Sequence, residues 1–236
     1  MATDVCVVTG GGGGLGAEVV ETVAARGWFV VVADADGRAA ARVARVAGGV
    51  GLRADLREPD RVRPVIAEAA GRGDLRLLVN CAGAWSPSSQ FPDGDEWRGT
   101  LALDLEAPML ATQLCLGPMR TAGGGAVVNV SSSAAFGEAA YGSPEYAAAK
   151  AGLVRFTTAS SGLAASHGVR VSCVVPHWIG LPRAYGEWSR LTPAQREASG
   201  GLVPTVEVVD TILALADDPS AAGRVVELRG RRPTGT

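Results

Sequence analysis

The chain lacks the features that would place it on a membrane or on nucleic acid. Its longest uninterrupted apolar run, Trp28 to Ala33, is far shorter than the roughly 20 residues that span a bilayer. The N-terminal segment has no basic stretch followed by an apolar one, so it does not look like a secretion signal. The formal net charge is -2, and the basic residues are scattered rather than clustered. We therefore expect a cytoplasmic protein that binds neither membranes nor nucleic acids.

Cysteine and lysine are both scarce. The four cysteines lie apart within apolar segments without metal-type spacing, which predicts small core residues and no metal site. Of the 22 lysine and arginine residues, only Lys150 is a lysine. The simplest explanation of the excess of arginine is codon bias in a GC-rich genome. The surviving lysine then indicates a place where a compact ammonium does what a guanidinium cannot.

Apolar runs of strand length alternate along the chain with segments of helical period. The first run, Val5 to Val8, precedes a helical pattern from Leu15 to Arg26. Further strands are predicted at Phe29–Ala33, Val50–Leu52, Leu75–Val79, Ala126–Val130, Val169–Val175 and Arg224–Leu228. The segments between them are long enough for crossover helices. This pattern predicts one α/β domain over residues 1–236, a Rossmann-type doubly wound parallel sheet of about seven strands with helices on both faces.

The stretch from His177 to about Pro204 has no clear pattern and is too long for an ordinary connection. It is either a functional lid or a poorly ordered loop. We expect it to form the substrate-loop region of the domain, at about residues 177–204.

A glycine-rich segment, Gly10 to Gly14 with Gly16, lies between the first predicted strand and the first predicted helix. There the backbone can approach a pyrophosphate closely, and the helix N-terminus can bind it. A flexible turn is the alternative, but the strand before and the helix after favour a dinucleotide.

Two acidic residues follow the next strands. Asp34 stands where a carboxylate accepts hydrogen bonds from ribose hydroxyls and repels a 2′-phosphate, which favours NAD(H) over NADP(H). Arg38 nearby is an alternative phosphate partner. Asp55 is a candidate for the adenine amino group, or else a turn or capping residue.

A serine run, Ser131 to Ser133, follows the fifth strand, and Tyr146 and Lys150 follow it at a spacing that puts them on one helix face. A tyrosine ordinarily loses its proton near a pH of about 10, so it needs help to act as a base at neutral pH. A cation one helical turn away favours the phenolate by direct attraction. A surface tyrosine and lysine on an amphipathic helix would be the alternative for an isolated pair.

Together these residues resemble the classical short-chain dehydrogenase/reductase family over essentially the whole chain. The matching elements are Thr9-Gly10 with Gly14 and Gly16, Asn80-Cys81-Ala82-Gly83, the serine run, Tyr146 with Lys150, and Pro176. The resemblance implies that Ser132 holds the substrate oxygen, Tyr146 transfers the proton, and Lys150 binds the nicotinamide ribose. It implies a wider cofactor site of Gly10, Gly14, Leu15, Gly16, Asp34, Asp55, Leu56, Asn80, Ala82, Gly83, Tyr146, Lys150, Pro176 and Ile179.

The chain departs from the family pattern near the catalytic group. The gap from Ser132 to Tyr146 is one residue longer than the commonest family spacing, so Ser133 is the alternative functional serine. Asp104, which we include in the catalytic group, stands where the family usually has an asparagine that supports a proton relay. Its carboxylate would stabilise charged Lys150 and oppose the phenolate. Alternatively, Asp104 packs at a helix bend.

Two further departures follow Pro176. Leu181 occupies the place of a family threonine that contacts the nicotinamide amide, and His177 replaces a common glycine. His177 either touches substrate or is structural. At the C-terminus, Arg229 to Arg232 stand where the family often has glycines and a short tail that packs against other subunits.

Aromatic residues make up only 5% of the chain, and they gather in the loops that follow the later strands. This placement favours an apolar, cyclic small-molecule substrate, unless the aromatics pack a lid onto the body. The expected substrate contacts are Ser132, Trp85, Tyr141, His177 and Trp178.

The pattern as a whole predicts an NAD(H)-dependent oxidoreductase that interconverts a secondary alcohol and a ketone. One alternative is a non-redox member of the same fold, such as a cyclase, dehydratase or epimerase, and another is a cofactor-sensing binding protein. The apolar helical segments Leu101–Met119 and Tyr146–Leu163 predict a homodimer or homotetramer, because related proteins pair helices at these places.

Overall fold

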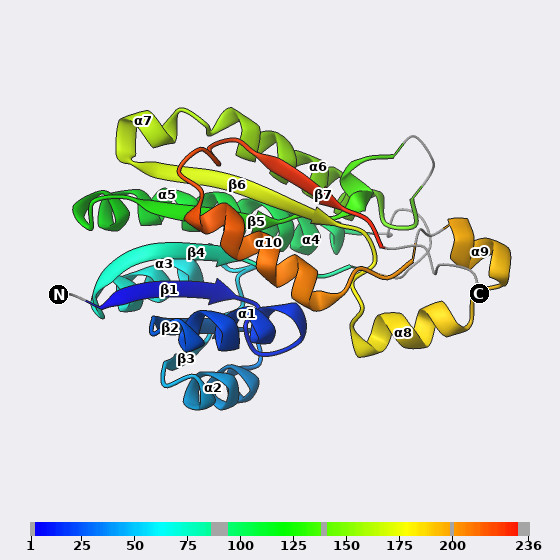
Figure 1. Ribbon diagram of the computed structural model, residues 1–236, viewed down its shortest axis with the longest axis horizontal. Helices are drawn as coiled ribbons and strands as arrows, with labels where there is room; N and C mark the ends of the chain where they lie inside the picture. Colours follow the sequence, from blue (N-terminus) through cyan, green and yellow to red (C-terminus); the bar gives the residue numbers. More distant parts are fainter. Residues whose placement is uncertain (1–2, 86–93, 138–140, 199–200, 231–236) are drawn as a thin grey trace.

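A computed structural model of the chain describes residues 3–85, 94–137, 141–198 and 201–230. In these ranges seven parallel strands form one sheet in the order β3-β2-β1-β4-β5-β6-β7 (Figure 1). The strands are β1 Asp4–Thr9, β2 Phe29–Asp34, β3 Val50–Arg53, β4 Asp74–Asn80, β5 Gly125–Val130, β6 Val169–Pro176 and β7 Val225–Leu228. The doubly wound α/β fold predicted from the sequence is confirmed.

All seven strands were predicted to within one residue at either end. The reason lies in burial: β1, β2, β5 and β6 are buried along nearly their whole length. A parallel strand covered on both faces reads as a continuous valine-rich run rather than an alternating one. Such runs stand out from the surrounding helical pattern.

Helices cover both faces of the sheet. The helical segments are α1 Gly14–Ala25, α2 Gly37–Val46, α3 Pro59–Ala70, α4 Trp97–Leu101, η1 Ala102–Glu106, α5 Ala107–Thr121, η2 Ser133–Ala135, α6 Pro144–Ala159, α7 Leu163–His167, α8 Pro182–Ser189, α9 Pro193–Ala198 and α10 Thr205–Asp217. Helices α1, α2 and α10 bury their apolar sides against one face, and α3 and α5 bury theirs against the other. The core therefore has two layers, one on each side of the sheet.

The long helices differ from the sequence prediction at their joints. The segment predicted as one helix over Tyr146–Leu163 is two, because α6 ends at Ala159 and α7 begins at Leu163. The segment Leu101–Met119 contains a five-residue π-helix, η1, between α4 and α5. Wide turns of this kind inside a helix occur frequently at functional sites.

The stretch after β6 contains two helices, α8 and α9, so the prediction that it lacks regular structure was wrong. Its two ends are joined by a β-bridge between Ile179 and Val203. The Val203 amide donates to the Trp178 carbonyl at 2.7 Å, and the Gly180 amide donates to the Val203 carbonyl at 2.8 Å. The stretch thus leaves and rejoins the body at one place and stands beside the end of the sheet (Figure 1). Residues 199–200 of the predicted region lie outside the described ranges.

Three of the four cysteines, Cys6, Cys115 and Cys173, are buried in the core as predicted, and the fourth, Cys81, is partly exposed. Within the described ranges, no helix combines the length and the apolar character needed to cross a membrane. Of the arginines near the C-terminus, Arg231 and Arg232 lie outside the described residues.

Candidate active site

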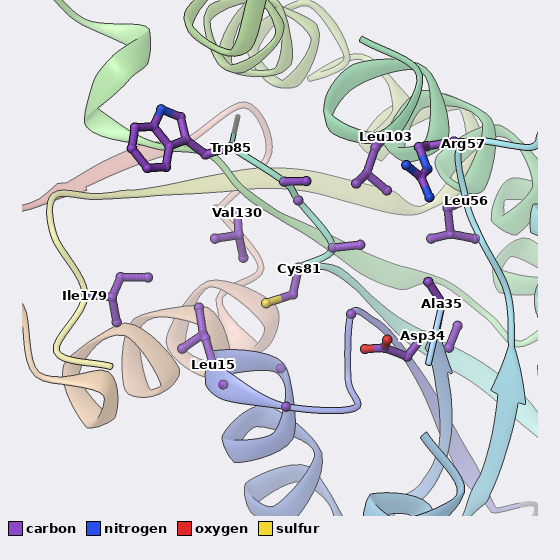
Figure 2. A pocket seen from close by; sticks show the side chains of 18 of the residues that line it. Leu15, Asp34, Ala35, Leu56, Arg57, Cys81, Trp85, Leu103, Val130 and Ile179 are labelled. Atoms are coloured by element: carbon purple, nitrogen blue, oxygen red, sulfur yellow. The ribbon is translucent and has the colours of Figure 1, made fainter. Parts of the chain in front are cut away.

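A cavity of about 650 Å³ opens at the carboxyl end of the sheet. The strand order reverses between β1 and β4, and the helices that follow these two strands leave toward opposite faces. A crevice at such a reversal is the usual ligand site of a doubly wound sheet. Figure 2 shows the cavity between the ends of the strands and the start of α1.

The glycine loop forms one wall of the cavity and has no room for side chains. A Cβ on Gly10, whose φ is +66°, would lie 2.8 Å from the Cα of Ala82. A Cβ on Gly16 would overlap the carbonyl oxygen of Gly10. At Gly13 a Cβ would meet no atom within 4 Å, so the loop is open there, where α1 begins. A closely packed loop that opens at a helix N-terminus fits a pyrophosphate.

Asp34 stands at the end of β2, beside the glycine loop. Its Oδ2 accepts a hydrogen bond from the Gly12 amide and its Oδ1 accepts one from the Asp36 amide, both at 2.9 Å. These bonds fix the carboxylate at the cavity wall, where it lies among the lining residues. Each oxygen keeps a lone pair for a further donor.

Asp55 also lines the cavity, but it is paired with Arg57, which the sequence prediction did not assign to the site. The Arg57 guanidinium donates to both carboxylate oxygens, with Nη2 2.6 Å from Oδ2 and Nε 2.9 Å from Oδ1. The hydrogen-bonded guanidinium holds the pKa of Asp55 below its usual range. Asp55 and Arg57 lie two residues apart just after the end of β3, so this spacing could have revealed the pair.

Buried polar side chains hold the strand ends in place. Asn80 donates from Nδ2 to Oδ1 of Asn129 at 2.8 Å, and Asn129 donates in turn to the Thr157 hydroxyl at 3.0 Å. Asn80 does not line the cavity, so its role in the structure is to join β4, β5 and α6. Thr9 accepts from the amides of Cys81 and Ala82 at 3.1 Å, which fixes the segment after β4 against β1.

The three serines after β5 differ in their positions. Ser131 lines the cavity and donates from its hydroxyl to the Lys150 carbonyl at 2.9 Å. Ser132 accepts from the Ala134 amide at 3.2 Å and so caps η2, which begins at Ser133. Neither Ser132 nor Ser133 belongs to the residues that line the cavity. Ser132 is held by its own turn, next to the cavity wall.

Tyr146 and Lys150 lie on the side of α6 that faces the cavity, and both line it. The Lys150 ammonium lies 5.5 Å from the centre of the Tyr146 ring. Tyr141, which precedes the helix, stacks on Tyr146 with ring centres 6.4 Å apart and planes inclined by 19°. Lys150 also donates to the Val130 carbonyl at 3.0 Å. The helix therefore brings the predicted pair together with a second aromatic ring beside it.

Asp104 is fully buried on the π-helix η1, and its Oδ1 lies 2.9 Å from the Lys150 ammonium. Its Oδ2 accepts from the Ala84 amide at 3.3 Å. A Cβ on Gly83 would come within 2.7 Å of Asp104 Oδ1, so the ion pair needs a glycine there. Asp104 thus touches Lys150 but does not itself line the cavity.

Burial and mutual attraction shift the pKa values of Asp104 and Lys150 in opposite directions. Burial raises the pKa of Asp104, although the Lys150 charge works to lower it. Burial alone would lower the pKa of Lys150, but Asp104 and the nearby Tyr146 outweigh that and raise it. Lys150 therefore stays charged at neutral pH. Burial also raises the pKa of the cavity-lining thiol Cys81 to about 12, so this thiol stays protonated.

Several predicted site residues lie elsewhere. His177 lies 2.8 Å from Glu227 on β7 through its Nε2, and it does not line the cavity. Pro176, Trp178 and Tyr141 are likewise outside the lining. Of the predicted substrate contacts, Trp85 alone belongs to it. The other lining residues that were predicted are Gly10, Gly14, Leu15, Gly16, Asp34, Asp55, Leu56, Ala82, Gly83, Tyr146, Lys150 and Ile179.

Gly13, Cys81, Ser131 and Leu181 also line the cavity, and they were named from the sequence only within motifs or as a departure from the family pattern. Sequence reasoning missed other lining residues: Ala33, Ala35, Ala54, Arg57, Ala84, Leu103, Val130 and Arg183. Most of them adjoin a predicted site residue at a strand end, so position alone could have identified them. Leu103 and Arg183 come from helical segments whose placement the sequence did not reveal.

A comparison with protein families agrees with this geometry. The family profile described as short chain dehydrogenase matches residues 4–184. The chain belongs to the short-chain dehydrogenase/reductase family. Cis-4-hydroxycyclohexanecarboxylate dehydrogenase of Sinomonas cyclohexanicum is 36% identical over 231 residues, covering 94% of this chain and 92% of the relative.

Two further relatives are similarly long matches. The short-chain reductase protein NovJ of Streptomyces niveus is 32% identical over 247 residues, covering 97% of this chain and 94% of the relative. Trans-4-hydroxycyclohexanecarboxylate dehydrogenase of Sinomonas cyclohexanicum is 32% identical over 240 residues, covering 94% of this chain and 88% of the relative.

As a member of the short-chain dehydrogenase/reductase family, the chain is an oxidoreductase that acts on CH–OH groups of a small molecule with NAD(P). The cavity fits this cofactor, because the glycine loop excludes side chains where a pyrophosphate needs close backbone approach. Among the described residues, no group of three or more histidine, cysteine, aspartate or glutamate side chains is arranged to hold a metal ion.

Proposed function

We propose that this short-chain dehydrogenase/reductase interconverts a secondary alcohol and a ketone on an apolar, cyclic small molecule, with NAD(H) preferred over NADP(H). The observation that carries the proposal is the buried Lys150 ammonium next to Tyr146, in a cavity that begins at the glycine loop. A tyrosine beside a fixed cation is suited to proton exchange with an alcohol oxygen.

In this proposal each residue has a separate task. Ser132, with Ser133 as the alternative, holds the substrate oxygen, and Tyr146 takes the hydroxyl proton in the oxidation direction. Lys150 binds the nicotinamide ribose and stabilises the phenolate by attraction. NAD(H), when bound, supplies the acceptor or donor of the hydride. Asp104 acts through Lys150, because its carboxylate is in contact with the ammonium and holds it in place.

The preference for NAD(H) rests on Asp34. Its carboxylate is fixed at the cavity wall, where it would repel a 2′-phosphate. Arg38, the alternative phosphate partner, does not line the cavity. Arg57 does line it, but its charge is matched by the bidentate bond to Asp55. The surroundings of the ribose are therefore better suited to hydroxyls than to a phosphate.

The preference for a ring substrate rests on the residues that line the end of the cavity away from Asp34. Figure 2 shows Trp85, Val130 and Ile179 at that end, away from Asp34 and Ala35. Apolar walls with an exposed aromatic side chain favour an apolar ring over a sugar. Two of the relatives are named as dehydrogenases of ring alcohols, the cis and trans 4-hydroxycyclohexanecarboxylates.

The test is the formation of NADH by the purified protein with cyclohexanol, cis-4-hydroxycyclohexanecarboxylate and galactose as substrates. We expect oxidation of the ring alcohols, slow or no oxidation of galactose, and tighter binding of NADH than of NADPH. Tyr146→Phe should lower kcat by about a thousandfold. An unchanged kcat in Tyr146→Phe would remove the tyrosine from the mechanism, and tighter NADPH binding would overturn the assignment of Asp34.

A further inference from the structure

Among the described residues, three cationic side chains line the cavity, and each of them is paired with a carboxylate. Arg57 is bound through two nitrogens to Asp55, and Lys150 is in contact with Asp104. The third cation, Arg183, is held differently. Its ion pair with Glu187 uses Nε alone, and in the described ranges no other residue bonds to the outer edge of the guanidinium.

Arg183 lies in the first turn of α8, and its Nε donates to Glu187 Oε1 at 2.8 Å. Its guanidinium lies over the Trp85 ring, 5.4 Å from the ring centre. Stacking uses the flat face of the guanidinium and leaves the N–H groups at its edge free to donate. Within the described part of the chain, the two Nη atoms make no hydrogen bond or ion pair, and the side chain is 65% exposed. The structure thus presents an aligned pair of donors next to the cavity.

The two Nη donors of Arg183 lie at the end of the cavity that contains Trp85. Trp85 lies at the end away from Asp34 and Ala35 (Figure 2). In the same segment as Arg183, Leu181 faces the glycine loop, since a Cβ on Gly14 would lie 3.6 Å from its Cδ1. An apolar side chain therefore faces the pyrophosphate region, whereas the guanidinium is beside the aromatic wall where a substrate ring would pack.

We propose that Arg183 anchors a carboxylate group of the substrate, and that Trp85 holds the guanidinium in place and packs against the substrate ring. This inference rests on the proposed function and narrows the substrate class to a cyclic secondary alcohol with a carboxylate away from the reacting carbon. A planar carboxylate matches two parallel donors of one guanidinium. Glu187 fixes the direction of Arg183 through Nε without occupying the outer edge.

The experiment measures binding without turnover. Cyclohexanecarboxylate and its neutral isostere cyclohexanecarboxamide are titrated by calorimetry into the NADH-saturated protein. We expect the carboxylate to bind more tightly than the amide. Arg183→Gln should weaken carboxylate binding by about tenfold and leave amide binding unchanged. Arg183→Lys keeps the charge but loses the two parallel N–H donors, so its affinity for the carboxylate should lie between those of the parent and of Arg183→Gln. The matched control is Arg190→Gln at the end of the same helix, outside the cavity lining, which should bind as the parent does.

Three results would overturn the inference. Equal binding of carboxylate and amide by the parent would mean that no anion site exists. Equal weakening of both compounds by Arg183→Gln would show a packing role. A comparable loss of NADH affinity in Arg183→Gln would assign the guanidinium to the cofactor pyrophosphate. Because neither compound is oxidised, a parent that binds the carboxylate through Arg183 but oxidises no ring alcohol would contradict the proposed function, while the carboxylate site itself would stand.

Discussion

Lys150 occupies a place where size and charge both matter. Its ammonium touches the Val130 carbonyl, the Asp104 carboxylate and the face of Tyr146 at once, and the residue is only 4% exposed. A guanidinium is planar and broader, so it cannot make these three contacts from the same backbone position. This explains why a chain that uses arginine almost everywhere keeps one lysine.

Lys150→Arg should therefore keep the charge but lose most of the activity. We expect kcat to fall by at least about tenfold at neutral pH, with partial recovery at high pH, because the broader guanidinium places the charge where it stabilises the phenolate less. The measurement is the pH profile of kcat, with a thermal melt beside it. A purely structural lysine would give a lower Tm without the pH trend, and a variant as active as the parent at every pH would exclude the tyrosine and lysine mechanism.

Asp104→Asn should move the pH profile of kcat/KM in the opposite direction. The Asp104 carboxylate offsets the Lys150 charge that favours the phenolate, so its removal leaves the ammonium with more effect on Tyr146. The rising limb of the oxidation rate should shift to lower pH by about one unit. Asparagine can still accept from the Ala84 amide.

The control for this shift is Glu106→Gln, on the same π-helix but exposed, which should leave the profile in place. A profile that stays unchanged in Asp104→Asn would mean that Asp104 packs at the helix bend without acting on the reaction.

At the scale of elements, the sequence predicted the strands more accurately than the helices. The strands were predicted well because burial on both faces produces continuous apolar runs. The break between α6 and α7 and the helices α8 and α9 were missed, although α8 and α9 each begin at a proline, Pro182 and Pro193, a residue typical of the first helical position.

The same distinction applies to the site. Tyr146 and Lys150 were found because one helical turn links them, and the glycine loop because a strand precedes it and a helix follows. The contact between Trp85 and Arg183 joins the segment that follows β4 to α8, so it depends on how the stretch after β6 folds back. The sequence left His177 as either a substrate contact or a structural residue, and its contact with Glu227 on β7, far along the chain, agrees with the structural alternative.

The junction of β1 and α1 gives a prediction for the glycine loop. Gly16→Ala should weaken NADH binding by at least about tenfold and lower Tm, because its Cβ would overlap the Gly10 carbonyl and push the loop out of place. Gly13→Ala is the matched control, since its Cβ meets open space and its φ of -172° suits any residue. Fluorescence titration with NADH and a thermal melt of both variants decide the matter. Equal behaviour of the two would contradict the close packing of the loop.

At the scale of the whole molecule, helices α5 and α6 carry exposed apolar and small side chains that a second copy could cover. Met109 on α5 is 42% exposed, and the outer side of α6 carries the small exposed residues Ala148 and Ala151. Small and apolar side chains let helices of two copies approach closely. This supports the prediction of a homodimer or homotetramer.

Sedimentation velocity tests the assembly. The parent should sediment as a dimer or tetramer at micromolar concentration, and Met109→Glu should shift it toward the monomer, because a charge would be buried between the helices. Val46→Glu is the control, since Val46 is 75% exposed on α2, away from that face. A parent that is monomeric would contradict the prediction, and so would an assembly that Met109→Glu leaves intact.

The most direct test of the account follows the hydrogen from the substrate carbon. The cyclic alcohol that the protein oxidises fastest is prepared with deuterium on its carbinol carbon and incubated with NAD⁺, and the nucleotide is analysed by mass spectrometry. We predict one deuterium in NADH for each ketone formed, with both products nearly absent in Tyr146→Phe. A converted substrate without deuterium in the nucleotide, as a cyclase, dehydratase or epimerase would give, would contradict the account.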